Sequence, residues 1–440
     1  MDNFTFVILL ATLVTLVPYA FSAAADAYLM ITDRTAFVGR RLVRDVVVAP
    51  FCDPHERPAL AQGPVGGRPI GRRGHRGDVI HLRGGEIEMR IVVVAPPWYE
   101  IPPRAYGGVE GVCFDLVEGL VSRGHDITLI GAGRRNTNAG FVATFRVPPS
   151  GLASPDRVWY ELIHAAKAAR AIDAIDPEIV HDHSVAGPLA SAGRSCPTVT
   201  TVHGEVESGS ADFYRTLPPG ASLVALSGNQ RSLAPDLPWA GVVHNGISVE
   251  QYPFRRDKDD FVLFLGRMAP DKGPDLAIEA ARRAGVSIVL AARCAGPAEV
   301  RYFDETIRPG LGAGATWLGE VDSHQKRDLL SRASCLLAPV RWDEPFGLVL
   351  VEALACGTPV VALQRGAVPE IVSDGTTGFV RSLPEELPDA ILRVDEIDPV
   401  ACRLDAEHRF SVDSMVRGYE RIYERVLARP RRASLHAIAS

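Results

Sequence analysis

MRIVVVA, residues 89–95, is the stretch that decides the fold, because the chain after it repeats its pattern. Its four consecutive β-branched residues show no polar alternation, which is typical of a strand buried on both faces of a parallel sheet. An amphipathic segment over 109–123 ends at Gly124, and 126–130 is the next apolar run. Strand, helix and strand at this spacing predict crossover units in a parallel sheet.

The alternation occurs twice along the chain. In the first series we expect a helix over 156–175 and further strands over 178–181, 198–202, 223–226 and 242–244. In the second series we expect strands over 261–266, 287–291, 316–318, 333–338 and 359–362. The helices of that series are expected over 271–284, over 297–308 and from 343–345 to 356. Polar residues 255–260 lie between the two series and form the predicted linker.

The two series predict an α/β protein with two Rossmann-like domains whose parallel sheets face a central cleft. We place the first domain at 89–250 and the second at 260–410. The last helix, 411–428, is expected to pack back on the first domain, and 1–88 form an N-terminal extension. Open parallel sheets bind ligands at the carboxyl ends of their strands, so the cleft is the expected ligand site.

Composition excludes several classes of protein. The chain has 440 residues, a net charge of −6 and 47% apolar residues, which is ordinary for a globular protein and leaves no basic field for nucleic acid. Its seven cysteines are odd in number and form no CxxC pair. That pattern disfavours both a disulfide scaffold and a structural zinc site, and it indicates a reducing, cytoplasmic compartment.

The N-terminal segment has three interpretations. Residues 4–25 carry no charge and are long enough to span a bilayer, with arginines at 34, 40, 41 and 44 that would hold the rest of the chain in the cytoplasm. A cleaved signal would normally carry a positive charge before its apolar run, and residues 1–3 have none. Alternatively, the native protein starts at Met89, because 53–85 are rich in Gly, Pro and Arg and look disordered. Membrane association through 4–25 therefore stays open.

The strongest motif is EPFGLVLVE, residues 344–352. Pro345 suits the first position of a helix, and Gly347 leaves the backbone exposed there. A helix start of this kind has unpaired N–H groups and the positive end of the dipole, which favour phosphate. Glu344 would precede the helix and Glu352 would lie about two turns inside it, so they could hold two ends of an extended ligand. The alternative is an N-cap glutamate and a surface glutamate.

A second motif, GRMAPDKG at 266–273, lies where a predicted strand ends and a helix begins. Arg267 presents a fork of N–H donors and Lys272 a point charge, and the two could reach one diphosphate. The alternative is a pair of solvated cations beside a helix.

Taken together, these segments resemble the family-4 retaining glycosyltransferases, whose fold is GT-B. Residues 344–352 look like the E-x7-E signature of that family, and the resemblance runs from Met89 onward. It implies that Glu344 contacts the transferred sugar, that Glu352 binds the ribose hydroxyls of the donor nucleotide, and that Arg267 and Lys272 hold its diphosphate. Further donor-binding positions implied by the resemblance are Gly107, Gly108, Gly347, Leu348, Gly366 and Ala367.

The resemblance extends to three further segments. His203, after the strand at 198–202, corresponds to a histidine that family members place near the transferred sugar. The alternative is a histidine at the end of a strand whose hydrogen bonds are all made within the protein. Residues 365–370 resemble the family's G-G-x-P-E loop, but Ala367 stands where the second glycine is expected, so the loop need not have the family's shape. Gly107-Gly108 lies at the first strand–helix junction, where glycines allow close approach to a phosphate.

The resemblance predicts a retaining hexosyltransferase that uses a nucleoside-diphosphate sugar and needs neither metal nor cofactor. The acceptor, a sugar, lipid or small molecule, would enter between 96–106 and 205–219. Residues 181–183, His-Asp-His, are not expected to bind metal because neighbouring strand side chains point in opposite directions. A sugar-nucleotide epimerase or a non-catalytic sugar-nucleotide binder remain alternatives. An NAD-dependent oxidoreductase is disfavoured, because no G-x-G-x-x-G follows Ala95.

Overall fold

The computed structural model describes residues 82–83, 86–103, 107–149, 156–218, 220–312 and 314–429. These belong to one compact unit, Asp78–Ser440. The predictions for residues 4–25 and for most of the extension lie outside the described residues. At its end, β1 (Leu82–Arg83) pairs antiparallel with β2 (Glu86–Ile87), a hairpin that the sequence pattern did not suggest. No helix in these ranges is long and apolar enough to cross a membrane.

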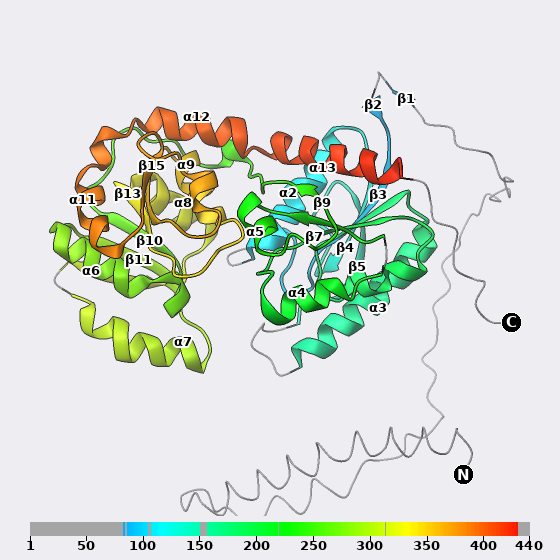
Figure 1. The fold of residues 1–440 in the computed structure, drawn as a ribbon, viewed down its shortest axis with the longest axis horizontal. Helices are drawn as coiled ribbons and strands as arrows, with labels where there is room; N and C mark the ends of the chain where they lie inside the picture. The colour runs from blue at the N-terminus through cyan, green and yellow to red at the C-terminus, as the bar shows by residue number, and fades with distance from the viewer. Residues whose placement is uncertain are drawn as a thin grey trace, which may run out of the picture. The chain divides into compact units, whose positions relative to one another are not determined.

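The first sheet is fully parallel, and its strands within the described residues have the order β5-β4-β3-β6-β7-β8-β9 (Figure 1). They are β3 (Arg90–Val94), β4 (Asp126–Ala132), β5 (Gly140–Phe145), β6 (Ile179–Asp182), β7 (Thr198–Thr201), β8 (Ser222–Ala225) and β9 (Trp239–Val242). Strand β5 was not predicted from the sequence; it is an edge strand, and Thr144 alone of its six residues is buried. The last strand was predicted at 242–244, three residues too late.

Helices cover both faces of this sheet, and strand β3 shows why its sequence is apolar throughout. Ile91 and Val93 pack with α2 (Gly108–Ser122), whereas Val92 and Val94 pack on the other face with α3 (Arg157–Ile175). All four side chains are almost fully buried. The remaining helices of this half are α4 (Ser208–Arg215) and α5 (Gly228–Leu233).

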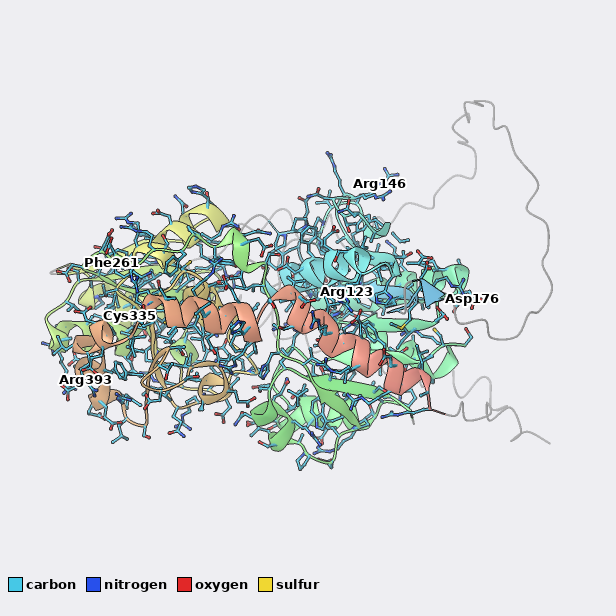
Figure 2. The ribbon with its side chains drawn as sticks, turned by 90° about the horizontal axis from the view of Figure 1, so that it is seen from above. Arg123, Arg146, Asp176, Phe261, Cys335 and Arg393 are labelled. Atoms are coloured by element: carbon cyan, nitrogen blue, oxygen red, sulfur yellow. The ribbon has the colours of Figure 1, made fainter. Side chains whose placement is uncertain are left out.

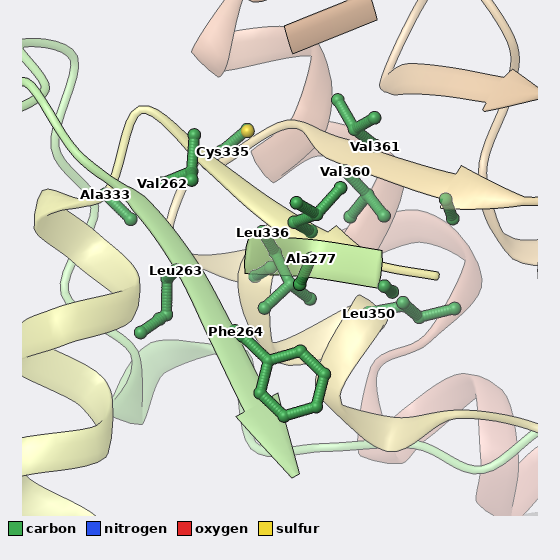
Figure 3. Close-up of a cluster of buried hydrophobic side chains, with 14 of the residues drawn as sticks. Val262, Leu263, Phe264, Ala277, Ala333, Cys335, Leu336, Leu350, Val360 and Val361 are labelled. Atoms are coloured by element: carbon green, nitrogen blue, oxygen red, sulfur yellow. The ribbon is translucent and has the colours of Figure 1, made fainter. Parts of the chain in front are cut away.

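The second sheet repeats this design with the strand order β12-β11-β10-β13-β14-β15, also parallel. Its strands are β10 (Val262–Arg267), β11 (Ile288–Arg293), β12 (Ala315–Gly319), β13 (Cys335–Ala338), β14 (Val360–Leu363) and β15 (Gly378–Arg381). Figure 3 shows the core, where Phe264 of β10 and Leu336 of β13 lie near Leu350 and Ala277. Those two residues belong to α9 (Leu348–Ala355) and α6 (Pro274–Ala284).

The other helices of this half are α7 (Pro297–Tyr302), α8 (Ser323–Arg332), α10 (Val368–Ile371), α11 (Leu387–Leu392) and α12 (Pro399–Arg409). The predicted helix at 271–284 is split: Pro270–Lys272 form a 3-10 turn, and α6 begins only at Pro274. The predicted helix at 297–308 continues from α7 into a π turn, Phe303–Ile307.

The last helix, α13 (Val412–Leu427), packs on the first sheet's side of the chain (Figure 1). Val416 and Tyr419 are fully buried in the cluster that contains Ile91. At the edge of this contact the guanidinium of Arg123, labelled in Figure 2, donates to Glu420 over 2.7 Å. Helix α13 is therefore part of the first core, although it follows the second sheet in sequence.

Both sheets reverse their winding beside their first strand, and this positions the site. In the second sheet the reversal lies between β10 and β13, and in the first it lies between β3 and β6. Open α/β sheets bind ligands at such reversal points, beside the loops that follow the carboxyl ends of the strands. The predicted α/β architecture with two parallel sheets is confirmed.

Candidate active site

The loops after β10 and β13 meet in an ion pair. Nζ of Lys272 lies 2.6 Å from Oε1 of Glu344, and only about a fifth of either side chain is exposed. Lys272 ends the 3-10 turn after β10, and its ammonium also lies over the ring of Trp342, 5.2 Å from the centroid. Two residues that the sequence analysis chose for different roles are thus in direct contact at the reversal point of the sheet.

The backbone of Glu344 is fixed by the loop after β14. Its carbonyl oxygen accepts a hydrogen bond of 3.0 Å from the amide of Ala367. Gly366 has φ of +50°, and a Cβ added there would lie 2.3 Å from the Glu344 nitrogen, so only glycine fits. Ala367 has φ of −80°, which any residue adopts, so alanine replaces the expected glycine without strain.

Helix α9 starts later than predicted. Pro345 does not occupy its first turn, because α9 begins at Leu348 after Gly347, whose φ of +89° turns the chain out of the helical path. Glu352 consequently lies about one turn inside the helix and not two. The first-turn amides of α9 still point out of its N-terminal end, which is the arrangement that favours an anion.

Glu352 is buried, with 8% of its surface exposed, so the alternative of a surface glutamate is wrong. Its Oε1 accepts hydrogen bonds from the hydroxyl of Tyr252 at 2.8 Å and from Nζ of Lys326 at 2.5 Å. Neither partner was predicted from the sequence. Tyr252 is 100 residues away along the chain and Lys326 is 26 away, so no local spacing pointed to them.

Arg267, at the end of β10, forms hydrogen bonds with carboxylates other than Glu344. Its guanidinium donates to Asp271 at 2.9 Å and to Glu299 at 3.1 Å. It lines an open hollow of about 420 Å³ together with 269–270, 295–299 and Tyr302. Arg267 and Lys272, which were predicted to act on one diphosphate, therefore have different carboxylate partners in this structure.

The glycine pair of the first domain marks the start of α2. Gly107 is the N-cap residue and Gly108 the first helical residue. A Cβ added at Gly108 would lie 3.2 Å from Cδ1 of Leu348, the first residue of α9. The starts of α2 and α9, both predicted to bind the donor, are thus neighbours in space.

His203 belongs to a group of three imidazoles at the carboxyl ends of β6 and β7. Its Nε2 lies 2.8 Å from Nδ1 of His183, whose ring is 4.0 Å from that of His181. His181 in turn contacts the hydroxyls of Tyr423 and Thr201 at 2.7 and 2.8 Å. Burial lowers the pKa of His203 to about 4 and that of His181 to about 3, so both rings are neutral near pH 7.

Asp182 does not join these rings, because its carboxylate accepts from the amide and hydroxyl of Ser184. In the part of the chain that the structure describes, no three His, Cys, Asp or Glu side chains are grouped to hold a metal ion.

Two known glycosyltransferase families match the two halves of the chain. Residues 106–251 match the family described as Glycosyltransferase Family 4, and residues 250–404 match Glycosyl transferases group 1. A solved glycosyltransferase involved in avilamycin A biosynthesis is 25% identical with a TM-score of 0.58, covering 78% of this chain and 99% of that one.

Two curated relatives come from Mycolicibacterium smegmatis. D-inositol 3-phosphate glycosyltransferase is 34% identical over 221 residues, which cover 44% of this chain and 50% of the relative. Alpha-maltose-1-phosphate synthase is 29% identical over 335 residues, or 64% of this chain and 82% of the relative. The match thus takes in only half the length of the first relative. On the two family matches and the shared GT-B architecture, the chain belongs to the group 1 glycosyltransferases.

Proposed function

We propose that this enzyme transfers a hexose from a nucleoside-diphosphate sugar to an acceptor hydroxyl with retention of anomeric configuration and without a metal ion. The observation that carries the proposal is the contact of Lys272 with Glu344 at the start of α9. It brings a cation and an amide-rich helix end, which suit a diphosphate, to one point with a carboxylate, which can accept hydrogen bonds from a sugar.

The diphosphate is proposed to lie against Lys272 and the first-turn amides at Gly347 and Leu348. In the reaction the bond from the anomeric carbon to the diphosphate oxygen breaks, and negative charge grows on the leaving group. Fixed positive charge aimed at that position lowers the barrier, because it needs no reorganisation during the step. Arg267 would complete this field once a donor draws it from Asp271 and Glu299.

Glu344 is proposed to position the transferred sugar, and Glu352 to accept hydrogen bonds from the ribose hydroxyls. The amide of Ala367 holds the backbone of Glu344, and Lys272 holds its carboxylate. The acceptor oxygen then bonds to the anomeric carbon on the face that the diphosphate leaves, and the acceptor proton departs with the diphosphate.

The first domain is proposed to bind the acceptor and the outer part of the sugar. His203 is neutral near pH 7, and its Nε2 is in contact with His183, so its Nδ1 is the nitrogen proposed to form one hydrogen bond with a sugar hydroxyl. The segments expected to border the acceptor, 96–106 and 205–219, follow β3 and β7. Because two relatives are named for a phosphorylated polyol or a phosphorylated sugar, such compounds are the first acceptors to assay.

The test combines a donor screen with a product assay. UDP, GDP and ADP sugars are compared by thermal shift, since a ligand that binds only the native state raises the melting temperature. The best donor is then incubated with an acceptor panel in EDTA, and the anomer formed is read by NMR. Acceptor-dependent release of nucleoside diphosphate with a retained anomer is the expected result. Isomerised donor without acceptor would instead identify an epimerase, and stabilisation without turnover a non-catalytic binder.

A further inference from the structure

Two donors from distant parts of the chain converge on one oxygen of Glu352. Tyr252 follows the turn at Val249–Gln251, before the second sheet begins, and Lys326 lies on α8. Both hydrogen bonds end on Oε1, at 2.8 and 2.5 Å. Among the described residues, no hydrogen bond reaches the second oxygen, Oε2. The carboxylate is therefore held by one oxygen while the other stays available.

The two donors are themselves fixed. Helix α8 starts with a capping box in which Asp322 and Gln325 satisfy each other's backbone amides, one residue before Lys326. The carbonyl of Tyr252 accepts a 2.8 Å hydrogen bond from Arg403. Burial and the neighbouring Glu352 carboxylate raise the pKa of Tyr252, so its hydroxyl remains a donor at any working pH.

We propose that Lys326 and Tyr252 are positioning residues that turn Glu352 so that Oε2 receives the ribose hydroxyls of the donor nucleotide. This inference rests on the proposed role of Glu352 and adds the residues that make that role selective. An ammonium and a phenol on one oxygen fix the rotation of the carboxylate. Without them, a buried Glu352 would gain no orientation from the helix alone, because its χ angles leave several rotamers open.

The experiment measures preference for ribose rather than affinity alone. Dissociation constants of UDP, GDP and ADP, and of their 2′,3′-dideoxy analogues, are determined by calorimetry for the wild type, Lys326→Met and Tyr252→Phe. In the wild type we expect the ribose form of the preferred nucleotide to bind at least about tenfold more tightly, from one or more hydrogen bonds to a charged acceptor. In both variants the ratio should fall severalfold while binding of the dideoxy form is retained.

A matched control lies on the same helix. Arg332 of α8 pairs with Asp259 and not with Glu352, so Arg332→Met removes a cation from α8 without touching the ribose contact. It should keep the wild-type ratio. Tyr252→Phe removes one oxygen only, and its melting temperature reports whether the fold is intact.

The outcomes distinguish a failure of this inference from a failure of the proposed function. A wild type that prefers the ribose form, with variants that keep the same ratio, would show that Lys326 and Tyr252 are merely structural and would overturn this inference alone. A wild type without any preference, or without nucleotide binding, would refute the role of Glu352 in the proposed function and this inference with it.

Discussion

Replacing Lys272 by methionine is the most informative perturbation of the site. The side chain keeps its length and loses its charge, so Glu344 loses a partner at 2.6 Å while both side chains are about four-fifths buried. Exposed ion pairs contribute about 0–1 kcal/mol, and breaking a fully buried one costs about 3–5 kcal/mol. For this intermediate case we expect the free energy of unfolding to fall by about 2 kcal/mol.

The effect on turnover should be larger than the effect on stability. A preorganised charge aimed at the leaving group is worth about 10²–10³ in rate, so kcat/KM of Lys272→Met should fall by about that factor. Urea unfolding and steady-state release of nucleoside diphosphate give the two numbers. The double variant Lys272→Met/Glu344→Gln removes the uncompensated charge, so it should recover stability but not activity. Activity of Lys272→Met within threefold of the wild type would refute the reasoning.

Three further outcomes are expected. Glu352→Gln should weaken nucleoside diphosphate binding by about tenfold in calorimetry, since a charged acceptor is lost, and unchanged affinity would contradict its assignment. Gly366→Ala should lower the free energy of unfolding in urea by about 2–5 kcal/mol, because of strain at the left-handed φ and the clash with Glu344. Ala367→Gly should lower it by about 1 kcal/mol or less. Equal effects of the two variants would be evidence against the loop geometry. The pKa of buried His181 is lowered to about 3, so unfolding below about pH 6.5 binds a proton there. His181 alone should therefore lower the free energy of unfolding by up to about 1.4 kcal/mol for each unit that the pH drops, and the slope should lessen by that amount in His181→Gln.

The sequence predicted the fold well because its signals are local. Buried parallel strands such as 89–95 and 261–266 are continuous apolar runs, and helices between them carry their own period. The misplaced elements have physical reasons. Strand β5 is an edge strand whose apolar run, 141–143, is only three residues long. The start of α9 depends on the positive φ of Gly347, a conformation that glycine permits but does not require.

The site was predicted in part for the same reason. Lys272 and Glu344 follow β10 and β13, and the topology of a doubly wound sheet brings the loops after those strands together. The partners of Glu352 could not be found in this way. Lys326 reaches it through the packing of α8 against α9, and Tyr252 through the connection between the two sheets, and neither contact leaves a pattern in a single sequence.

The central claim is that one diphosphate binds at Lys272 and the start of α9. A crystal structure with the nucleoside diphosphate that stabilises the protein most tests it directly. We expect phosphate oxygens within hydrogen-bond distance of Lys272 Nζ and of the amides at Gly347 or Leu348, with the ribose at Glu352. A diphosphate bound away from these groups, with the Lys272–Glu344 contact undisturbed, would contradict the account.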